Sequence, residues 1–185
     1  MRPALRSVFV LACVVAGAAG SMQACKAPNP DDITEVDAPP FDQFAGANVS
    51  ATQAGVSRVL EKRCGTLDCH GQVGRALRIY GVLGLRFEQP DSSAEPGQGA
   101  TTQLELEANY QSVIGLQPEI MTLVHELQEP PEALLLMRKP LQLERHKGGP
   151  VFVEGDDAYN CLASWLASGG DAGATDFTAC GNASQ

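Results

Sequence analysis

The stretch that decides the fold is residues 58–71, with the sequence RVLEKRCGTLDCHG. Its first part belongs to an amphipathic helix, because apolar residues recur on one face at the 3–4 residue spacing of a helix. That face is formed by Val56, Val59 and Leu60. Ser50 and Gln53 have the spacing of a capping box, which satisfies free backbone amides at a helix start. The sequence therefore predicts a helix from Ser50 to about Arg63 that leads directly into Cys64.

The second part of the stretch places a histidine immediately after two cysteines. Cys64 and Cys69 are separated by four residues, and His70 follows Cys69 directly. In c-type haem attachment two thiols bond to the porphyrin and the adjacent histidine becomes the proximal iron ligand, usually with a spacer of two residues. The sequence predicts one covalent haem c on Cys64 and Cys69, with His70 on the iron.

Two other uses of these residues stay open. Cys64 and Cys69 are far enough apart to form a local disulfide in a haem-free domain, with His70 an ordinary surface residue. Two cysteines and a histidine also give three ligands for a metal ion. Zinc sites usually space paired cysteines by two to four residues, which includes this spacing, but they need a fourth ligand.

The sixth iron ligand is expected from the second half of the chain. His146 precedes Gly148 and Gly149, whose small size lets the backbone approach a flat ring system, so it is the preferred candidate. Met137 is the alternative. Met121 and His125 share one face of a predicted helix, which favours a core or surface role for each. Basic side chains follow Met137, where they could neutralise haem carboxylates, receive an acidic redox partner or simply be solvated; they are Arg138, Lys139, Arg145 and Lys147.

The remaining pattern is helical with long irregular connections. A short strand or extended segment fits residues 77–80, and helices are expected over residues 104–114, 118–127, 132–137 and 156–167. The last of these has a buried stripe of Leu162, Trp165 and Leu166. Cys161 within it and Cys180 in the tail are expected to form a disulfide worth about 2–4 kcal/mol. The predicted fold class is mostly α.

Three segments together resemble the single-haem cytochrome c-like domain of exported bacterial proteins: residues 59–71, 146–149 and 159–165. The resemblance covers roughly residues 50–170. It implies a small helical domain in which the first and last helices cross and close a haem crevice, and a function in electron transfer without catalytic residues. The alternative is a haem-free, disulfide-stabilised structural or binding lipoprotein. A haem enzyme or gas sensor is a weaker third candidate, since no distal acid–base pair is evident.

The N-terminus predicts export. Arg2 and Arg6 precede an uncharged apolar run at residues 7–20, which is shorter than the ~20 residues of a membrane span. The following residues resemble a bacterial lipobox ending at Cys25, with Met22 where that motif usually has leucine. Cys25 is thus the expected lipid anchor, although an ordinarily cleaved or uncleaved signal leaves it without a role. The expected organisation is a signal peptide at 1–24, an anchor and flexible linker at 25–47, and the cytochrome c-like domain at 48–185.

Charge restricts the partners. The chain has 22 acidic and 13 basic residues, for a formal net charge of −9, and removing the signal takes away two basic residues and no acidic one. Such a chain repels nucleic acid and anionic membrane surfaces. We therefore expect an unidentified redox partner protein, membrane association through the lipid anchor only, and a location on the periplasmic side of a bacterial membrane.

Overall fold

The computed structural model describes residues 36–46, 54–87, 99–126, 129–168 and 173–185. They belong to one compact unit, Glu35–Gln185. The predicted signal peptide and Cys25 lie outside the described residues, as does the capping box at Ser50 and Gln53. No helix in the described ranges has the length and apolar content that crossing a membrane requires.

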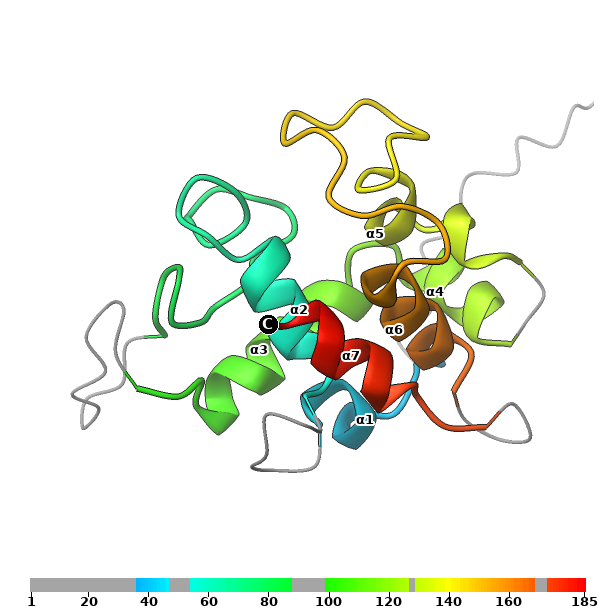
Figure 1. Cartoon of the computed structure of the whole chain (residues 1–185), viewed down its shortest axis with the longest axis horizontal. Coiled ribbons are helices and arrows are strands. Elements are labelled where there is room, and N and C mark those ends of the chain that lie inside the picture. The colour runs from blue at the N-terminus through cyan, green and yellow to red at the C-terminus, as the bar shows by residue number, and fades with distance from the viewer. Residues whose placement is uncertain (1–35, 47–53, 88–98, 127–128, 169–172) are drawn as a thin grey trace, which may run out of the picture. The chain divides into compact units, whose positions relative to one another are not determined.

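The protein is mostly helical, as the sequence predicts, and no β-strand occurs among the described residues (Figure 1). Residues 78–80 accordingly have no regular secondary structure. The elements in chain order are α1 (Phe41–Ala45), α2 (Val56–Arg63), α3 (Gln103–Ile114), α4 (Pro118–His125), the short 3-10 helix η2 (Pro131–Ala133), α5 (Leu135–Arg138), α6 (Asp157–Leu166) and α7 (Phe177–Ala183).

Helix α2 begins at Val56, later than the predicted start at Ser50. Ala54 and Gly55 are not helical, and Gly55 is the N-cap residue. A Cβ atom at Gly55 would lie 2.4 Å from the carbonyl oxygen of Phe44, so the chain passes too close to α1 for any other residue here. The close approach of residues 44–46 to Gly55 is therefore a constraint on the start of α2 that the local capping pattern does not contain.

Helix α3 is fixed by a capping box that the sequence also contains. The Thr102 side chain accepts a hydrogen bond from the Glu105 amide, and the Glu105 carboxylate accepts one from the Thr102 amide. Helices α4 and α6 match their predicted ranges within about two residues, and the predicted turn at 132–137 divides into η2 and α5. Helix α6 has its predicted buried stripe, completely inaccessible to solvent: Leu162, Trp165 and Leu166.

The C-terminus forms a further helix that the sequence pattern did not predict. Helix α7 packs beside α6 (Figure 1), and the predicted disulfide between Cys161 and Cys180 joins them. The Nε of Arg63 at the end of α2 donates to the carbonyl oxygen of Ala183, 3.1 Å away. The tail is thus part of the core beside the helix that leads into Cys64.

Residues 36–46 correct the predicted linker. The composition of residues 26–47 predicts a flexible tether, but Phe44 is fully buried, with its ring centre 5.3 Å from that of Trp165 and 5.5 Å from that of Tyr110. The indole Nε1 of Trp165 donates to the carbonyl oxygen of Pro40 at 3.3 Å. Burying a phenylalanine stabilises by about 1.5–3 kcal/mol, so this segment folds with the domain, which therefore begins before residue 48.

Candidate functional site

A cavity of about 170 Å³ lies between the segment after α2 and the segments around α5. Its lining is mainly aliphatic and aromatic, including Leu60, Leu77, Leu116, Leu135, Leu136 and Phe152. Cys64, His70 and His146 lie in the same lining. His70 and His146 also line a wider, open cleft of about 650 Å³, so both histidines stand where an apolar interior meets solvent.

His70 is positioned by a tightly folded loop. Its backbone amide donates to the carbonyl oxygen of Cys64 at 2.8 Å, and the amide of Gly71 donates to that of Thr66 at 2.9 Å. A Cβ atom at Gly71 would lie only 2.0 Å from the carbonyl oxygen of Gly65. The fold around the cysteines therefore depends on glycine at position 71.

The His70 ring is held in one tautomer. Its Nδ1 lies 2.9 Å from the carbonyl oxygen of Leu77, which can only accept, so Nδ1 carries the hydrogen. Burial lowers the pKa of His70, and the nearby His146 and Arg75 lower it further, against the opposing effect of the Leu77 hydrogen bond. The ring is therefore neutral at pH 7 and its Nε2 has a free lone pair, the arrangement that metal-binding histidines use.

His146 repeats this arrangement on the opposite side of the pocket. Its Nδ1 lies 2.9 Å from the carbonyl oxygen of Gly149, which leaves Nε2 available as well. The ring centres of His70 and His146 are 6.2 Å apart and the ring planes differ by 12°. Metal–imidazole bonds are about 2.0–2.1 Å long, so two rings that share one metal through Nε2 have centres about 6 Å apart. The pair is suited to hold one metal centre from two sides.

The two cysteines of the motif are free thiols, not a disulfide. Cys64 is 7 % exposed and lines the cavity, whereas Cys69 is half-buried and lines the open cleft. Burial, with a smaller contribution from the neighbouring Cys69, raises the pKa of Cys64 to about 12. Cys64 is a neutral thiol at pH 7, which disfavours a role as a nucleophile.

The other candidate ligands lie away from this pocket. Met137 and Met121 are fully buried in the core and are not part of the pocket lining. His125 directs Nδ1 at the carbonyl oxygen of Leu166, 3.2 Å away, and its Nε2 lies 3.7 Å from a carboxylate oxygen of Asp37. Of the four residues considered, the structure brings only His146 to His70.

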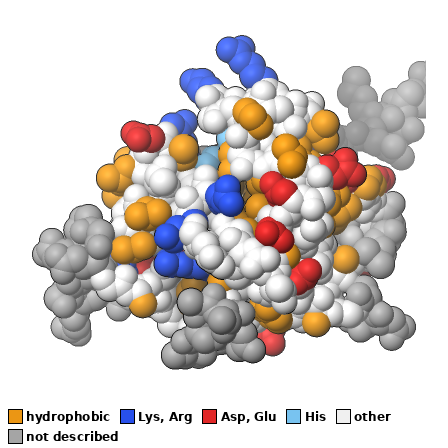
Figure 2. All heavy atoms as spheres, in the orientation of Figure 1, with side chains coloured by type: hydrophobic (Ala, Val, Ile, Leu, Met, Phe, Trp, Pro, Cys, Tyr) orange, Lys and Arg blue, Asp and Glu red, His pale blue; other side chains and the backbone are white. Residues whose placement is uncertain are grey.

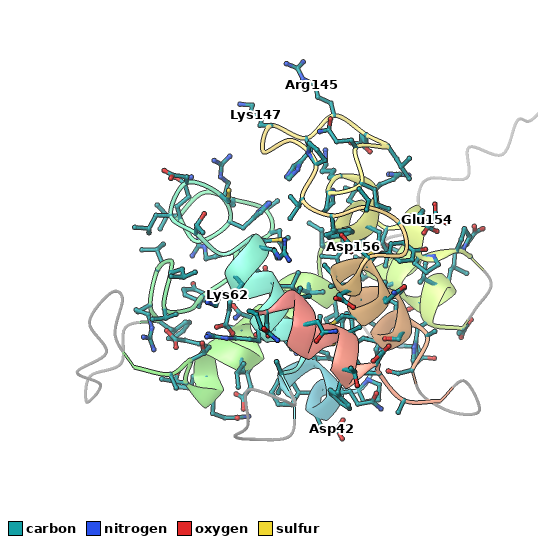
Figure 3. The ribbon with its side chains drawn as sticks, viewed as in Figure 1. Asp42, Lys62, Arg145, Lys147, Glu154 and Asp156 are labelled. Carbon is teal, nitrogen blue, oxygen red and sulfur yellow. A yellow bond between two sulfur atoms is a disulfide. The ribbon has the colours of Figure 1, made fainter. Side chains whose placement is uncertain are left out.

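The expected basic cluster lies partly at the cleft. Lys139, Arg145 and Lys147 line the cleft with Arg75, which the sequence analysis did not single out. Arg138 instead pairs with Glu144 at 3.3 Å. In Figure 3 the side chains of Arg145 and Lys147 extend from the tip of the loop that follows α5, and in Figure 2 basic side chains project at the same place.

A simple metal-ion site has no support in the part of the chain that the structure describes. No group of three histidine, cysteine, aspartate or glutamate side chains there is placed to hold an ion. Comparisons of the chain with protein-family models, with curated proteins and with solved structures find no match. The residues that line the pocket are therefore the basis for assigning a function.

Proposed function

We propose that the protein is a c-type cytochrome that transfers electrons through one haem. The observation that carries this proposal is the pair of nearly parallel imidazole rings with centres 6.2 Å apart, in an apolar pocket directly beside two free cysteines. These features suit a c-type haem: an apolar lining for the macrocycle, histidine nitrogens as iron ligands, and thiols for covalent attachment. When bound, haem supplies a metal centre that gains and loses one electron.

The residues of the pocket have separate roles in this proposal. Cys64 and Cys69 hold the haem covalently, while His70 and His146 bind the iron as proximal and distal ligands. Leu77 and Gly149 fix the two histidine tautomers through their carbonyl oxygens. The aliphatic lining provides an apolar surface for the macrocycle. Because electron transfer makes and breaks no covalent bond, no catalytic residue is needed.

The proposal includes export and a lipid anchor at Cys25, as expected for a cytochrome c-like domain that is loaded outside the cytoplasm. Mass spectrometry of the exported protein tests this: the chain should lack residues 1–24 and carry a diacylglycerol on Cys25. A chain with Cys25 unmodified would remove the anchor from the proposal and leave the haem site unaffected.

Haem binding is tested on the protein expressed together with a haem-attachment system. We expect a band near ~550 nm on reduction, as c-type haem generally gives, a haem stain that survives denaturation, and an intact mass increased by one porphyrin. The haem-free alternative predicts no band and a mass reduced by the hydrogens of a Cys64–Cys69 disulfide. That second result would sink the proposal.

The distal ligand is tested by two methionine changes. His146→Met should keep the covalent haem and raise the reduction potential by on the order of 0.1 V, because Met/His ligation raises the potential and axial ligands span ≈0.8 V in all. Met137→Leu is the matched control and should leave the potential unchanged. If Met137→Leu changes the potential and His146→Met does not, Met137 is the ligand.

A further inference from the structure

We propose that electrons pass through the open cleft and that the cleft receives a redox partner with a negatively charged face. This inference depends on the proposed function and adds the chemistry of the partner to it. The observation that supports it is that the cleft lining is mainly basic whereas the chain as a whole is acidic.

The cleft is basic in an acidic protein. Its lining contains four basic residues, Arg75, Lys139, Arg145 and Lys147, and one acidic residue, Asp68. The whole chain has a formal net charge of −9. Lys139 is paired with Glu144 at 2.8 Å. No ion pair joins the other three to a carboxylate among the described residues.

The positive charge is concentrated at one end of the segment that follows α5. Arg145 and Lys147 extend from its tip, whereas Glu154 and Asp156 lie at its other end, near the start of α6 (Figure 3). The two basic side chains are exposed and stand on either side of His146 in the sequence. A partner that approaches His146 therefore meets positive charge first.

Apolar side chains are exposed on both segments that form the cleft. Leu67 and Val73 flank the His70 motif and are 53 % and 70 % exposed, and Leu143 and Val153, each 63 % exposed, flank the His146 loop. Protein interfaces combine an apolar centre with a polar or charged rim. Exposed apolar residues on the same segments as these cations are therefore suited to a protein partner with an acidic rim.

Local charge and net charge make opposite predictions for such a partner. Charges are screened beyond about 8 Å at physiological ionic strength, so the groups at the contact site decide the sign of the interaction. If the net charge governed the reaction, anionic partners would be repelled. If the cleft governs it, anionic partners are attracted, and salt slows the reaction.

The experiment uses two small oxidants of opposite charge on the reduced, haem-loaded protein. Ferricyanide takes one electron from the iron and becomes ferrocyanide; the cationic tris(phenanthroline)cobalt(III) complex takes one electron and becomes the cobalt(II) complex. Stopped-flow rates are measured with each oxidant over a range of ionic strength. We expect the ferricyanide rate to fall as ionic strength rises, despite the acidic chain.

Matched variants locate the effect. Lys147→Gln should lower the ferricyanide rate and raise the cobalt rate, and Arg145→Gln combined with it should change their ratio by about tenfold at low salt. Lys62→Gln is the control, since Lys62 lies on α2 outside the cleft lining and the substitution removes the same charge. It should leave the ratio nearly unchanged.

Three results would overturn the inference. One is a ferricyanide rate that rises with ionic strength in the unaltered protein, and another is an equal effect of Lys62→Gln and Lys147→Gln. The third is a change of both oxidant rates in the same direction, because that reports a changed potential and means that the cations serve the haem carboxylates. If the protein takes up no haem, the absorption band near ~550 nm is absent before any rate is measured. That result overturns the proposed function and this inference together.

Discussion

The two sides of the pocket position one histidine each, and they do so by different means. The His70 side, residues 64–87, holds its ring on a loop whose backbone segments around Gly65, Gly71 and Gly84 pack directly against one another. The His146 side, residues 139–152, holds its ring on an exposed loop with few buried anchors. Both rings nevertheless line the same cavity and use Nδ1, not Nε2, for their backbone contacts.

The His70 side is held by close backbone contacts and buried polar groups. The amide of Leu85 donates to the carbonyl oxygen of Gly71 at 2.8 Å, and Ile79 donates to that of His70 at 2.9 Å. The fully buried Asn109 on α3 accepts from the amide of Tyr80 at 2.6 Å and donates to its carbonyl oxygen at 2.8 Å. The second half of this side, residues 78–87, is tied to α3 by hydrogen bonds to Ser112, Asn109 and Glu105.

A larger share of the His146 side is exposed, and two of the side-chain hydrogen bonds within its loop are long. Gln142 donates to the carbonyl oxygen of His146 at 3.3 Å, and Lys139 donates to that of Arg145, also at 3.3 Å. Gln142, Arg145 and Gly148 are exposed. We therefore expect the fold to fix His70 more firmly than His146, whose loop is more exposed.

Gly71→Ala should have the largest effect, because it breaks the His70 side. The new Cβ atom would lie 2.0 Å from the carbonyl oxygen of Gly65 and 2.8 Å from the Cα of Gly84, both backbone atoms that cannot move aside. We expect a loss of more than about 4 kcal/mol of folding free energy, measured by urea unfolding. Gly74→Ala is the control: Gly74 has φ +81° but open space around its Cα, so only about 1 kcal/mol of strain is expected. Equal losses for the two variants would show that the close contacts are not what fixes this side.

Glu105→Gln should have the next largest effect, because Glu105 anchors the far end of the same side. Its carboxylate lies 2.7 Å from Arg86 Nε and accepts from the amide of Phe87 at 2.9 Å, and its side chain is fully buried. Breaking a buried pair costs about 3–5 kcal/mol, which should appear in urea unfolding at pH 7. The matched Glu61→Gln should cost far less at pH 7, because burial raises the pKa of Glu61 despite its hydrogen bonds from Thr101 and Ser57.

The same two variants should differ in pH dependence. Burial opposes ionisation of Glu105, but its hydrogen bonds with Arg86, Thr102 and Phe87 outweigh that effect and lower its pKa. Its contribution to stability is therefore present above the ordinary glutamate pKa and is lost as pH falls through the lowered value. Glu105→Gln should flatten the acid limb of the stability curve. Glu61 has a raised pKa, so its contribution is lost as pH rises, and Glu61→Gln should make the acid limb steeper. The reverse pattern would contradict both assignments.

Local patterns in the sequence predicted those parts of the site that depend on spacing. The Cys64, Cys69 and His70 motif and the glycines after His146 identify residues that the structure brings to the cavity and the adjoining cleft. Helix α6 was predictable for the same reason, since its buried stripe recurs within a few residues. The capping box at Thr102 was present in the sequence as well and could have placed the start of α3 one residue earlier.

Features that depend on distant contacts were not predictable from one sequence. Phe44 is buried because Trp165 covers it, and nothing near Phe44 indicates that partner. The buried face of helix α3 includes the polar Glu105 and Asn109 beside Val113 and Ile114. Those polar side chains are buried because the backbone of residues 80–87 supplies their hydrogen bonds, which no periodicity of apolar residues reveals.

Gly148→Ala should have the smallest effect on stability and tests whether His146 is adjustable. The added Cβ would lie 3.2 Å from Cε1 of the His146 ring, a contact that the ring can relieve by shifting a few tenths of an ångström. Because the ring is on an exposed loop, we expect the free energy of unfolding to change by less than about 1 kcal/mol, while the NMR signals of the His146 ring move. Gly149→Ala is the control, since it adds strain at φ +73° with nothing near the new Cβ, and it should change stability without contacting the ring. A loss of several kcal/mol in Gly148→Ala would mean that His146 is fixed as rigidly as His70, and the contrast between the two sides would not hold.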